Sequence, residues 1–340
     1  AQQREAEEGA RQEHAGAGKD AELPLVTVLV AARDEEARLP RTLDCLLAQD
    51  WPRDRLQLVV VDDRSDDATP QVLRDFAARH PGRLEHLRVN AVPPGVSPKK
   101  HALSLGLQAA RGAWIAVTDA DCTMGAGWLR ALARRFEPGV GMVLGVTAYE
   151  EPAQGFSPAA GARALEFLSY GVAAAGLAGV GFPVSANANN LAYRREAFDA
   201  AGGYSAHGAI VSGDDDFTLQ AIHAAGWDFR FCADHAARVR TEPPADFCAF
   251  WEQRKRWVGK TIHYRRAQVA FLSLVYLFYV STAALLACGL LRIGPAHLGL
   301  LGLAGLAAKT GGEYMSMRAG LALFGLSPLM RFFGIASALH

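Results

Sequence analysis

Residues 114–121 read WIAVTDAD, a mostly apolar run that ends in two carboxylates. An apolar run bounded by a polar break predicts a buried β-strand. Because side chains alternate faces along a strand, Asp119 and Asp121 are expected to point the same way. Two acids at the carboxyl end of a strand suit a hard divalent cation, which is often shared with substrate phosphates. For this motif taken alone, a solvated turn after a strand is the alternative.

Strand-like and helix-like segments alternate around this run. Residues 25–32 (LVTVLVAA) are typical of a strand buried on both faces of a parallel sheet. The other predicted strands are 56–61, 84–89 and 141–147, and the predicted helices are about 33–47, 69–80, 99–110 and 128–136. This alternation predicts an α/β fold with a parallel sheet, whose ligands bind outside the carboxyl ends of the strands.

Acidic residues follow three of the predicted strands. They are Asp34, Glu35 and Glu36 after the first, Asp62 and Asp63 after the second, and Asp119 and Asp121 after the strand at 114–118. We expect these three strand ends to converge on one crevice. Helix N-capping is the alternative for each, because the helix macrodipole favours acids at that end.

Residues 211–217 read VSGDDDF and form a second acidic cluster. Three adjacent carboxylates repel one another, so at least one is expected to have a raised pKa. A carboxylate that holds a proton readily in a pocket suits a general base. An exposed helix N-terminus is the other interpretation, since Phe217, Leu219 and Ile222 begin a helical pattern, and the two interpretations are compatible.

A basic, aromatic segment, FWEQRKRW at 250–257, precedes the most apolar part of the chain. Six Lys and Arg residues lie from Arg254 to Arg266, which is typical of a cytoplasmic membrane flank. That interpretation does not explain the two tryptophans and Gln253. Arginine can bind a diphosphate with two parallel hydrogen bonds, and tryptophan can stack on a sugar.

The last part of the chain predicts membrane helices. Residues 267–291 are 25 residues without a charge, more than the roughly 20 needed to span a bilayer. Residues 293–308 could return across the membrane or be re-entrant, and 321–339 could be an interfacial helix or a third span. A cytoplasmic basic flank would place the catalytic crevice on the cytoplasmic side of a multi-pass protein in the inner cell membrane.

Composition sets further limits. The chain has 340 residues, a formal net charge of zero and five cysteines without a C-x-x-C pair, so neither a nucleic-acid binder nor a zinc or disulfide framework is indicated. Residues 1–22 are polar, lack the apolar core of a signal peptide and are expected to be disordered, and without an initiator Met an upstream piece could be missing. The predicted domains are this segment, a catalytic domain at 23–265 and a membrane region at 266–340.

Together these motifs resemble the membrane-bound family 2 glycosyltransferases of the GT-A type, which have a Rossmann-like nucleotide-diphospho-sugar domain. The resemblance is carried by VTVLVAARDEEARLPRTLDCLLAQ, VVVDDRSDD, KKHALSLGLQAARG, VTDADC, NNLAYRREAFDAAGGY, SGDDDF and QRKRW. The last motif, Q-x-x-R-W, is similar to that of the processive polysaccharide synthases, such as the cellulose, hyaluronan and poly-N-acetylglucosamine synthases.

The resemblance implies a role for each matching residue. It implies a UDP- or GDP-sugar donor contacted by Asp34, Glu36, Asp62, Asp63 and Lys99, with Asp119 and Asp121 as the D-x-D pair that holds Mg²⁺ or Mn²⁺. It implies that Gln253, Arg256 and Trp257 bind diphosphate or acceptor, and that Asp214 or Asp215 is the general base. The acceptor would be a lipid or glycan at the membrane, and a single displacement would invert the anomeric configuration.

Two departures from the family pattern stand out. The base motif is usually T-E-D or E-D, and here it reads Gly213-Asp214-Asp215-Asp216, of which we favour Asp214. The membrane region is also short for a polymer synthase. The competing functions are an inactive glycosyltransferase-like scaffold and a nucleotidyltransferase, although the glycine-rich basic start of the latter is absent after the first strand.

Overall fold

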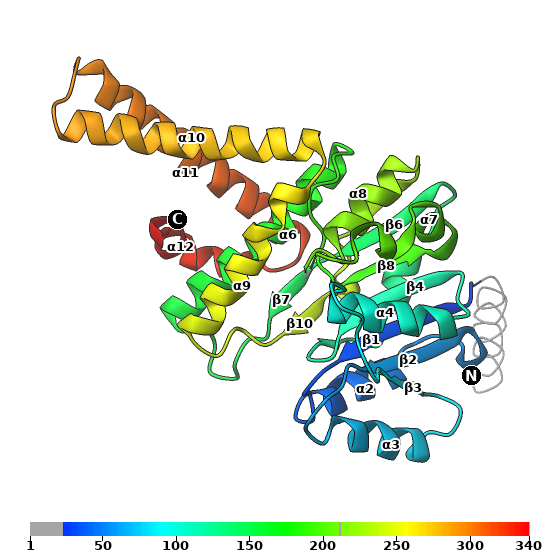
Figure 1. Ribbon diagram of the computed structural model, residues 1–340. Helices are drawn as coiled ribbons and strands as arrows, with labels where there is room; N and C mark the ends of the chain where they lie inside the picture. The colour runs from blue at the N-terminus through cyan, green and yellow to red at the C-terminus, as the bar shows by residue number, and fades with distance from the viewer. Residues whose placement is uncertain (1–22, 211, 340) are drawn as a thin grey trace, which may run out of the picture.

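A computed structural model describes residues 23–210 and 212–339, so the prediction of disorder at 1–22 lies outside the described residues. The centre of the protein is a seven-stranded sheet in the order β3-β2-β1-β4-β8-β6-β9 (Figure 1). Its strands are β1 (Val26–Ala32), β2 (Leu56–Asp62), β3 (Glu85–Arg88), β4 (Trp114–Asp119), β6 (Val140–Gly145), β8 (Leu191–Arg194) and β9 (Asp228–Cys232). A smaller sheet, β5-β10-β7, contains β5 (Thr123–Met124), β7 (Thr147–Tyr149) and β10 (Val239–Thr241).

The expected convergence of strand ends is present in the first half of the sheet. Strands β1, β2, β3 and β4 are parallel, and the register aligns Ala32 with Asp62 and Ala31 with Asp119. The carboxyl ends of β1, β2 and β4 therefore lie level at one edge. The polar residues that follow these strands are therefore close together. Ligands of such sheets bind in the crevice outside the carboxyl ends of the strands.

The predicted parallel arrangement holds for the other strands of the large sheet but not for β8. Strand β8 runs antiparallel to both β4 and β6. The predicted strand 141–147 is two strands in different sheets, and its break falls after Gly145, where an added Cβ would lie 2.5 Å from the Asn190 side chain. Strands as short as β7 and β8 carry too little periodicity to be found from the sequence.

Helices cover both faces of the large sheet, as expected for strands buried on both sides. The helices of this part are α2 (Leu39–Leu47), α3 (Thr69–Arg79), α4 (Pro98–Ala109), α5 (Trp128–Ala133), α6 (Pro158–Gly179), α7 (Arg195–Ala200), α8 (Asp216–Ala224) and α9 (Phe247–Gly259). Val28 and Val30 of β1 pack in a core with residues of α2, α3 and α5, whereas Leu29 packs with residues of α4, α7 and α8. Both cores contain fully buried apolar side chains.

Helix α2 begins later than predicted. Residues 34–36, expected to open the helix, instead form a loop whose backbone N–H groups donate to side chains of the loop after β2. The acceptors are Ser65, Thr69 and Asp67. These bonds satisfy the backbone outside a helix, and they join the two loops at the carboxyl edge of the sheet.

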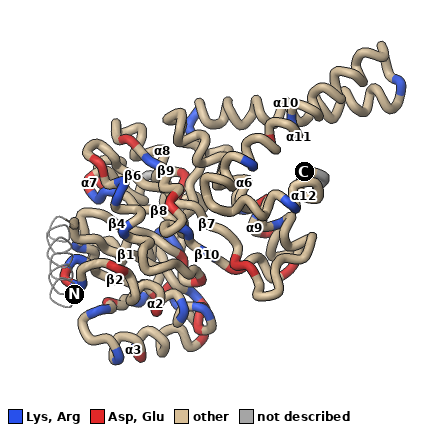
Figure 2. Tube along the Cα trace, turned by 180° about the vertical axis from the view of Figure 1, so that it is seen from behind, with Lys and Arg blue, Asp and Glu red and all other residues tan. Residues whose placement is uncertain are grey.

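Two long helices project from the α/β part as an antiparallel hairpin (Figure 1). Helix α10 (Arg266–Leu290) is the one helix, among the described residues, that is long and apolar enough to cross a membrane. Charged residues are spread over the α/β part but are sparse along this hairpin (Figure 2). The first predicted span, 267–291, therefore coincides with α10.

The two segments after α10 have other bounds as helices than the predicted 293–308 and 321–339. Helix α11 (His297–Leu323) continues well past residue 308, and Lys309 and Glu313 form an ion pair of 3.2 Å along it. Residues 321–339 are not one helix but the end of α11, a 3₁₀ segment η5 (Ser327–Phe332) and the short α12 (Phe333–Leu339). Gly325, at φ +65°, and the following Pro328 end the long helix.

The base of the hairpin is buried in the α/β part. Leu321 and Phe324, at the end of α11, pack in one core with Leu165 and Leu168 of α6 and with Phe332 of η5. At Gly320 an added Cβ would lie 2.5 Å from the Val172 side chain, so α11 approaches α6 closely. The hairpin is thus fixed to α6, which also forms a wall of the cavity described next.

Candidate active site

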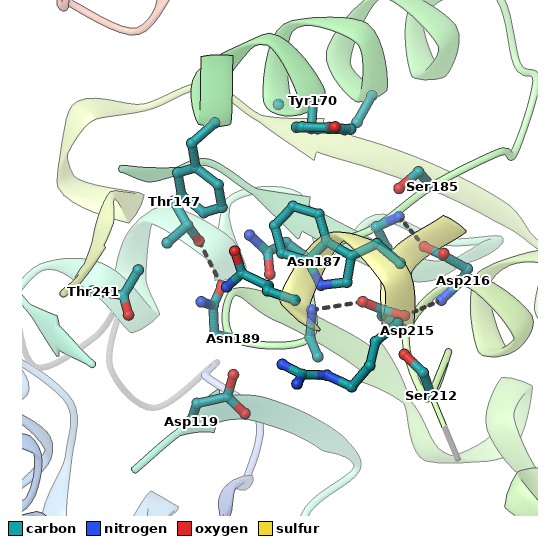
Figure 3. Close-up of a pocket in the computed structure, with 18 of the residues that line it drawn as sticks. Asp119, Thr147, Tyr170, Ser185, Asn187, Asn189, Ser212, Asp215, Asp216 and Thr241 are labelled. Carbon is teal, nitrogen blue, oxygen red and sulfur yellow. Dashed lines mark hydrogen bonds between the residues drawn. The ribbon is translucent and has the colours of Figure 1, made fainter. Parts of the chain in front are cut away.

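A cavity of about 830 Å³ lies at the carboxyl edge of the sheet, between β4, α6, α9 and the loops 184–189 and 212–216. Asp119 faces it from one side, and Asp215 and Asp216 lie across from Asp119 (Figure 3). The charged, amide and aromatic residues that matter for chemistry and line it are Lys99, Asp119, Asp121, Asp214, Asp215, Asp216, Gln253, Arg256, Trp257 and Lys260. Acids from two distant segments, the end of β4 and the loop at 212–216, are therefore brought together.

Lys99, in the first turn of α4, joins the two acidic clusters. Its Nζ lies 2.8 Å from Asp119 Oδ1 and 3.2 Å from Asp214 Oδ2. Burial disfavours its charged form, but the two carboxylates outweigh burial and hold the pKa of Lys99 above its usual value. Lys99 is therefore a cation at neutral pH, and it lowers the repulsion between Asp119 and Asp214.

Asp121 is less engaged than Asp119. Its Oδ2 accepts a hydrogen bond from Thr241 Oγ1 at 3.3 Å, and its Oδ1 contacts the Cys122 thiol at 3.4 Å. The hydroxyl contact is long for an O–H···O hydrogen bond, and a thiol is a weak donor. The carboxylate of Asp121 thus keeps capacity for a further electrostatic partner in the cavity.

The loop before α8 carries the second acidic cluster. Gly213 has φ +83°, and a Cβ there would lie 2.5 Å from the Phe217 ring, so glycine is required directly before Asp214. Asp215 caps α8 by accepting from the Asp216 backbone N–H at 2.7 Å. The structure thus combines the helix start and the cavity-lining acids, which the sequence analysis treated as compatible.

Lys260, just after α9, holds two acids of this cluster. Its Nζ lies 3.1 Å from Asp215 Oδ1 and 2.6 Å from Asp216 Oδ2, and Tyr264 donates a hydrogen bond to Asp216. Burial and the charge of Asp215 raise the pKa of Asp216 to about 6. For Asp215, burial is outweighed by Lys260, which holds its pKa below the usual value. The expected raised pKa thus belongs to Asp216.

Helix α9 presents the Q-x-x-R-W residues to the cavity. Gln253, Arg256 and Trp257 line it, whereas Arg254 points into the protein and forms an ion pair with Glu166 of α6. The guanidinium of Arg254 also lies 4.3 Å from the centre of the Trp257 ring. Arg254 therefore holds α9, and with it Trp257, against α6.

The family model described as "Glycosyltransferase like family 2" matches residues 24–260, which includes every residue of this cavity up to Lys260. The chain belongs to this family of glycosyltransferases. The "Beta-monoglucosyldiacylglycerol synthase" of Trichormus variabilis is 29% identical over 250 residues, 73% of this chain and 51% of that protein. The "Probable glycosyltransferase YdaM" of Bacillus subtilis is 26% identical over 243 residues, 69% of this chain and 55% of that protein.

The chain spans about half the length of the curated relatives it matches. Among solved structures, the mannosyltransferase PcManGT from Pyrobaculum calidifontis, in complex with GDP-Man and Mn²⁺, has a TM-score of 0.61 at 24% identity. The match covers 94% of this chain and 88% of that one. The expected GT-A fold of this glycosyltransferase is confirmed, whereas its relation to the processive synthases stays a prediction.

Four residues predicted to contact the donor are not among those that line the cavity. Asp62 is buried, accepts from the Ser65 N–H at 2.9 Å and pairs with Arg88 at 2.5 Å. Asp63 is 2.9 Å from Arg64. The carboxylates of Asp62 and Asp63 are thus already engaged beside the cavity.

Asp34 and Glu36 hold the neighbouring loop. Asp34 Oδ1 accepts from the Asp66 N–H and Glu36 Oε2 from the Ala68 N–H, each at 2.8 Å. These carboxylates join the loops after β1 and β2. A role for Asp34 and Glu36 toward a nucleoside is still a prediction.

Glu35 was expected only as part of an acidic strand end, and its surroundings distinguish it from its neighbours. Burial, opposed by Arg38 and reinforced by the charges of Asp121 and Asp119, raises its pKa to about 7. Its Oε2 lies 3.3 Å from Arg38 Nη1, and Arg38 lines the cavity. No local pattern in the sequence separates Glu35 from Asp34 and Glu36, because the difference is one of burial.

The donor set suits the divalent cation that the family implies. Asp119 and Asp121 lie two residues apart at the end of β4 and line the cavity, with the lightly engaged oxygens of Asp121 as hard donors. Within residues 23–210 and 212–339 no group of three His, Cys, Asp or Glu side chains could hold a metal. Two carboxylates fit Mg²⁺ or Mn²⁺ that takes its remaining oxygens from water and a substrate diphosphate.

Proposed function

We propose that this glycosyltransferase moves a sugar from a UDP- or GDP-linked donor to a hydroxyl of a lipid or glycan acceptor at the membrane, with inversion of the anomeric carbon. One observation carries the proposal: Asp119, Asp121, Asp214 and Arg256 line a single cavity. Its size fits a nucleotide sugar, because pockets for small ligands are about 300–1,000 Å³.

Asp214 is the general base in this proposal. The oxygens of Asp215 are occupied by Lys260, the Asp216 N–H and the Ala188 N–H, at 3.1, 2.7 and 3.2 Å. Asp214 lines the same cavity as the D-x-D pair. The Lys99 Nζ that lies 3.2 Å from Asp214 Oδ2 also lies 2.8 Å from Asp119 Oδ1. These contacts favour Asp214 over Asp215, as the motif alone had suggested.

The reaction is a single displacement. Asp214 takes the proton of the acceptor hydroxyl as its oxygen attacks the anomeric carbon. The new C–O bond forms while the bond to the diphosphate breaks, and the electron pair leaves with the diphosphate. Attack from the opposite face converts an α-linked donor into a β-linked product, and the name of the relative from T. variabilis contains a β-linked glucosyl group.

Cationic side chains near the diphosphate stabilise the charge of the leaving group. Arg256 provides a planar guanidinium that can bind two phosphate oxygens, and Lys99 lies beside Asp119. Mg²⁺ or Mn²⁺ held by Asp121 and Asp119 would supply Lewis-acid stabilisation of the same charge. The Mn²⁺ and GDP-Man bound to the structurally similar mannosyltransferase support this assignment.

Membrane attachment is part of the proposal. The apolar α10 and the basic residues before it support a span with the active site on the cytoplasmic side of the inner cell membrane. The Lys309–Glu313 ion pair reduces the cost of placing α11 in the bilayer as a second span. A lipid acceptor agrees with the diacylglycerol named in the relatives.

A donor screen tests the reaction type. Membranes containing the protein would be incubated with individual nucleotide sugars and Mn²⁺ or Mg²⁺, and the released nucleotide product would be identified. We expect nucleoside diphosphate and a glycosylated lipid or glycan. Release of pyrophosphate would instead show a nucleotidyltransferase, and no turnover of any donor would favour a scaffold.

A further inference from the structure

Lys260 is the point at which α9 meets the acidic loop. It follows the last residue of α9, its side chain is 9% exposed, and its Nζ lies 3.1 Å from Asp215 and 2.6 Å from Asp216. The same helix carries Arg256, one turn earlier. Any shift of α9 relative to the loop would therefore break a buried contact with two carboxylates.

The two carboxylates also hold a third segment. Asp216 Oδ1 accepts from the Ala186 N–H at 2.8 Å, and Asp215 Oδ2 accepts from the Ala188 N–H at 3.2 Å. Residues 184–189 form a wall of the cavity (Figure 3). One lysine thus connects the end of α9, the acidic loop and this wall.

The stem of Lys260 also packs beside the residue that precedes the proposed base. A Cβ at Gly213 would lie 3.3 Å from Lys260 Cδ. On the other side of the loop, Lys100 Nζ donates to the carbonyls of His207, Ile210 and Ser212 at 2.9 to 3.1 Å. The backbone before Asp214 is therefore confined from two directions.

We propose that Lys260 is a positioning residue: by anchoring the acidic loop to the end of α9 it holds the base Asp214 in place across the cavity from Asp119 and Asp121. This inference rests on the proposed function, since it assigns Lys260 an effect that acts through Asp214. A buried ion pair is weak evidence for stability alone, because desolvation offsets much of its attraction. A role in geometry explains why a compact ammonium that reaches two carboxylates stands here.

The test compares Lys260→Met with Lys255→Met, a control on the exposed face of α9 whose lysine pairs with the exposed Glu252. Misplacing a reacting group by about 1 Å can cost about a hundredfold in rate. We expect Lys260→Met to lower kcat for transfer by about tenfold to a hundredfold, while the Kd for nucleoside diphosphate changes by less than about twofold. Lys255→Met should match the wild type.

Repeating Lys260→Met in an Asp214→Asn background separates positioning from a general structural effect. If Lys260 acts through the base, its loss should lower the residual rate by less than about twofold once the base is gone. Equal fold losses in the two backgrounds, or a normal kcat for Lys260→Met, would overturn the inference. Normal turnover of Asp214→Asn would instead refute the proposed base.

A second pair of variants covers the case in which Lys260→Met does not fold. Lys260→Met combined with Asp216→Asn removes one of the two carboxylate charges that the lysine neutralises, and it is compared with Asp216→Asn alone. We expect the same loss of kcat between these two as between Lys260→Met and the wild type. An unchanged kcat in this pair would refute the positioning role.

Discussion

Two lysines, Lys99 and Lys260, lie between carboxylates of the cavity. Each Nζ is 2.6 to 3.2 Å from an oxygen of two different aspartates. Both are held in the charged form by acids that outweigh burial and raise their pKa values. Because each lysine contacts two acids, four of the carboxylates can line one pocket without strong net repulsion. At the scale of single residues, the site is a balance of buried charges in which two lysines are each shared by a pair of acids.

Asp121→Asn tests the metal site at this scale. The substitution keeps the shape of the side chain but removes its charge, so we expect the effect of Mn²⁺ on donor binding to fall by about tenfold to a hundredfold. Titration calorimetry with nucleoside diphosphate, with and without Mn²⁺, measures it. The exposed Asp228→Asn is the control. Equal Mn²⁺ dependence in Asp121→Asn and the wild type would exclude Asp121 as a ligand.

His207 predicts a pH dependence of stability. Burial and the nearby Lys100 lower its pKa to about 4, and its Nε2 is buried with no hydrogen-bond partner among the residues that the structure describes. A histidine with a lowered pKa stabilises the fold above its unfolded pKa of about 6.5, and this contribution is lost as the pH falls toward 4. The wild type should therefore lose more unfolding free energy than His207→Phe between pH 7 and pH 4.5. Urea unfolding in detergent measures this difference, and parallel curves for the two proteins would contradict it.

One side of helix α9 packs against α6, and another side lines the cavity. Arg254 faces α6 and pairs with Glu166, and both side chains are nearly buried, at 11% and 13% exposed. Gln253, Arg256 and Trp257 face the cavity, while Phe247 and Trp251 are exposed. The helix is therefore held by one arginine while it presents another to the cavity.

At the scale of the element, Arg254→Met tests whether Arg254 anchors α9 to α6. Removing one partner of a buried pair leaves the Glu166 charge uncompensated, and the expected loss of unfolding free energy is about 3–5 kcal/mol. Lys255→Met, which breaks an exposed pair, should cost less than about 1 kcal/mol. Chemical unfolding in detergent compares them, and Glu166→Gln added to Arg254→Met should restore part of the loss. Similar stability of the two single variants would refute the anchoring role.

The whole molecule is an α/β transferase domain fixed through α6 to the hairpin of α10 and α11. The core shared by α6, α11 and η5 contains Leu168, Leu321 and Phe332, so the hairpin base is part of the domain rather than a loose tether. Because α6 also lines the cavity through Tyr170, the orientation of the active site to the hairpin is set by packing.

Gly320→Leu tests this attachment. A side chain at 320 would meet Val172 of α6, and overpacking typically costs about 1–3 kcal/mol. Gly312→Leu on the same helix is the control, because nothing lies within 4 Å of an added Cβ there. We expect a lower thermal unfolding midpoint for Gly320→Leu only. Equal midpoints for the two variants would show that α11 does not pack on α6 as described.

Most of the parallel half of the fold was predictable because β1, β2 and β4 are apolar runs buried on both faces. Strands β8, β9 and β10 were not, because they have three to five residues and pair with partners far along the chain. The end of α11 was also missed, since the apolar run on which the prediction was based ends before Lys309, whereas the helix continues through an ion pair and close packing on α6.

The site was predictable where chemistry and local pattern coincide. Asp119, Asp121, Asp214 and Arg256 were expected together from strand ends and motifs, and they share one cavity. Lys260 was not expected, because its charge was interpreted as part of a membrane flank. Its role depends on a contact with residues 44 and 45 positions earlier in the chain, which composition and spacing do not encode.

The most direct test of the account is the turnover and donor affinity of Asp214→Asn with the donor that the screen identifies. The substitution keeps the fold and the diphosphate-binding residues, so donor Kd should stay within about twofold while kcat falls by about a hundredfold to ten-thousandfold. Near-normal kcat would contradict the assignment of Asp214 as the base on which the proposed mechanism depends.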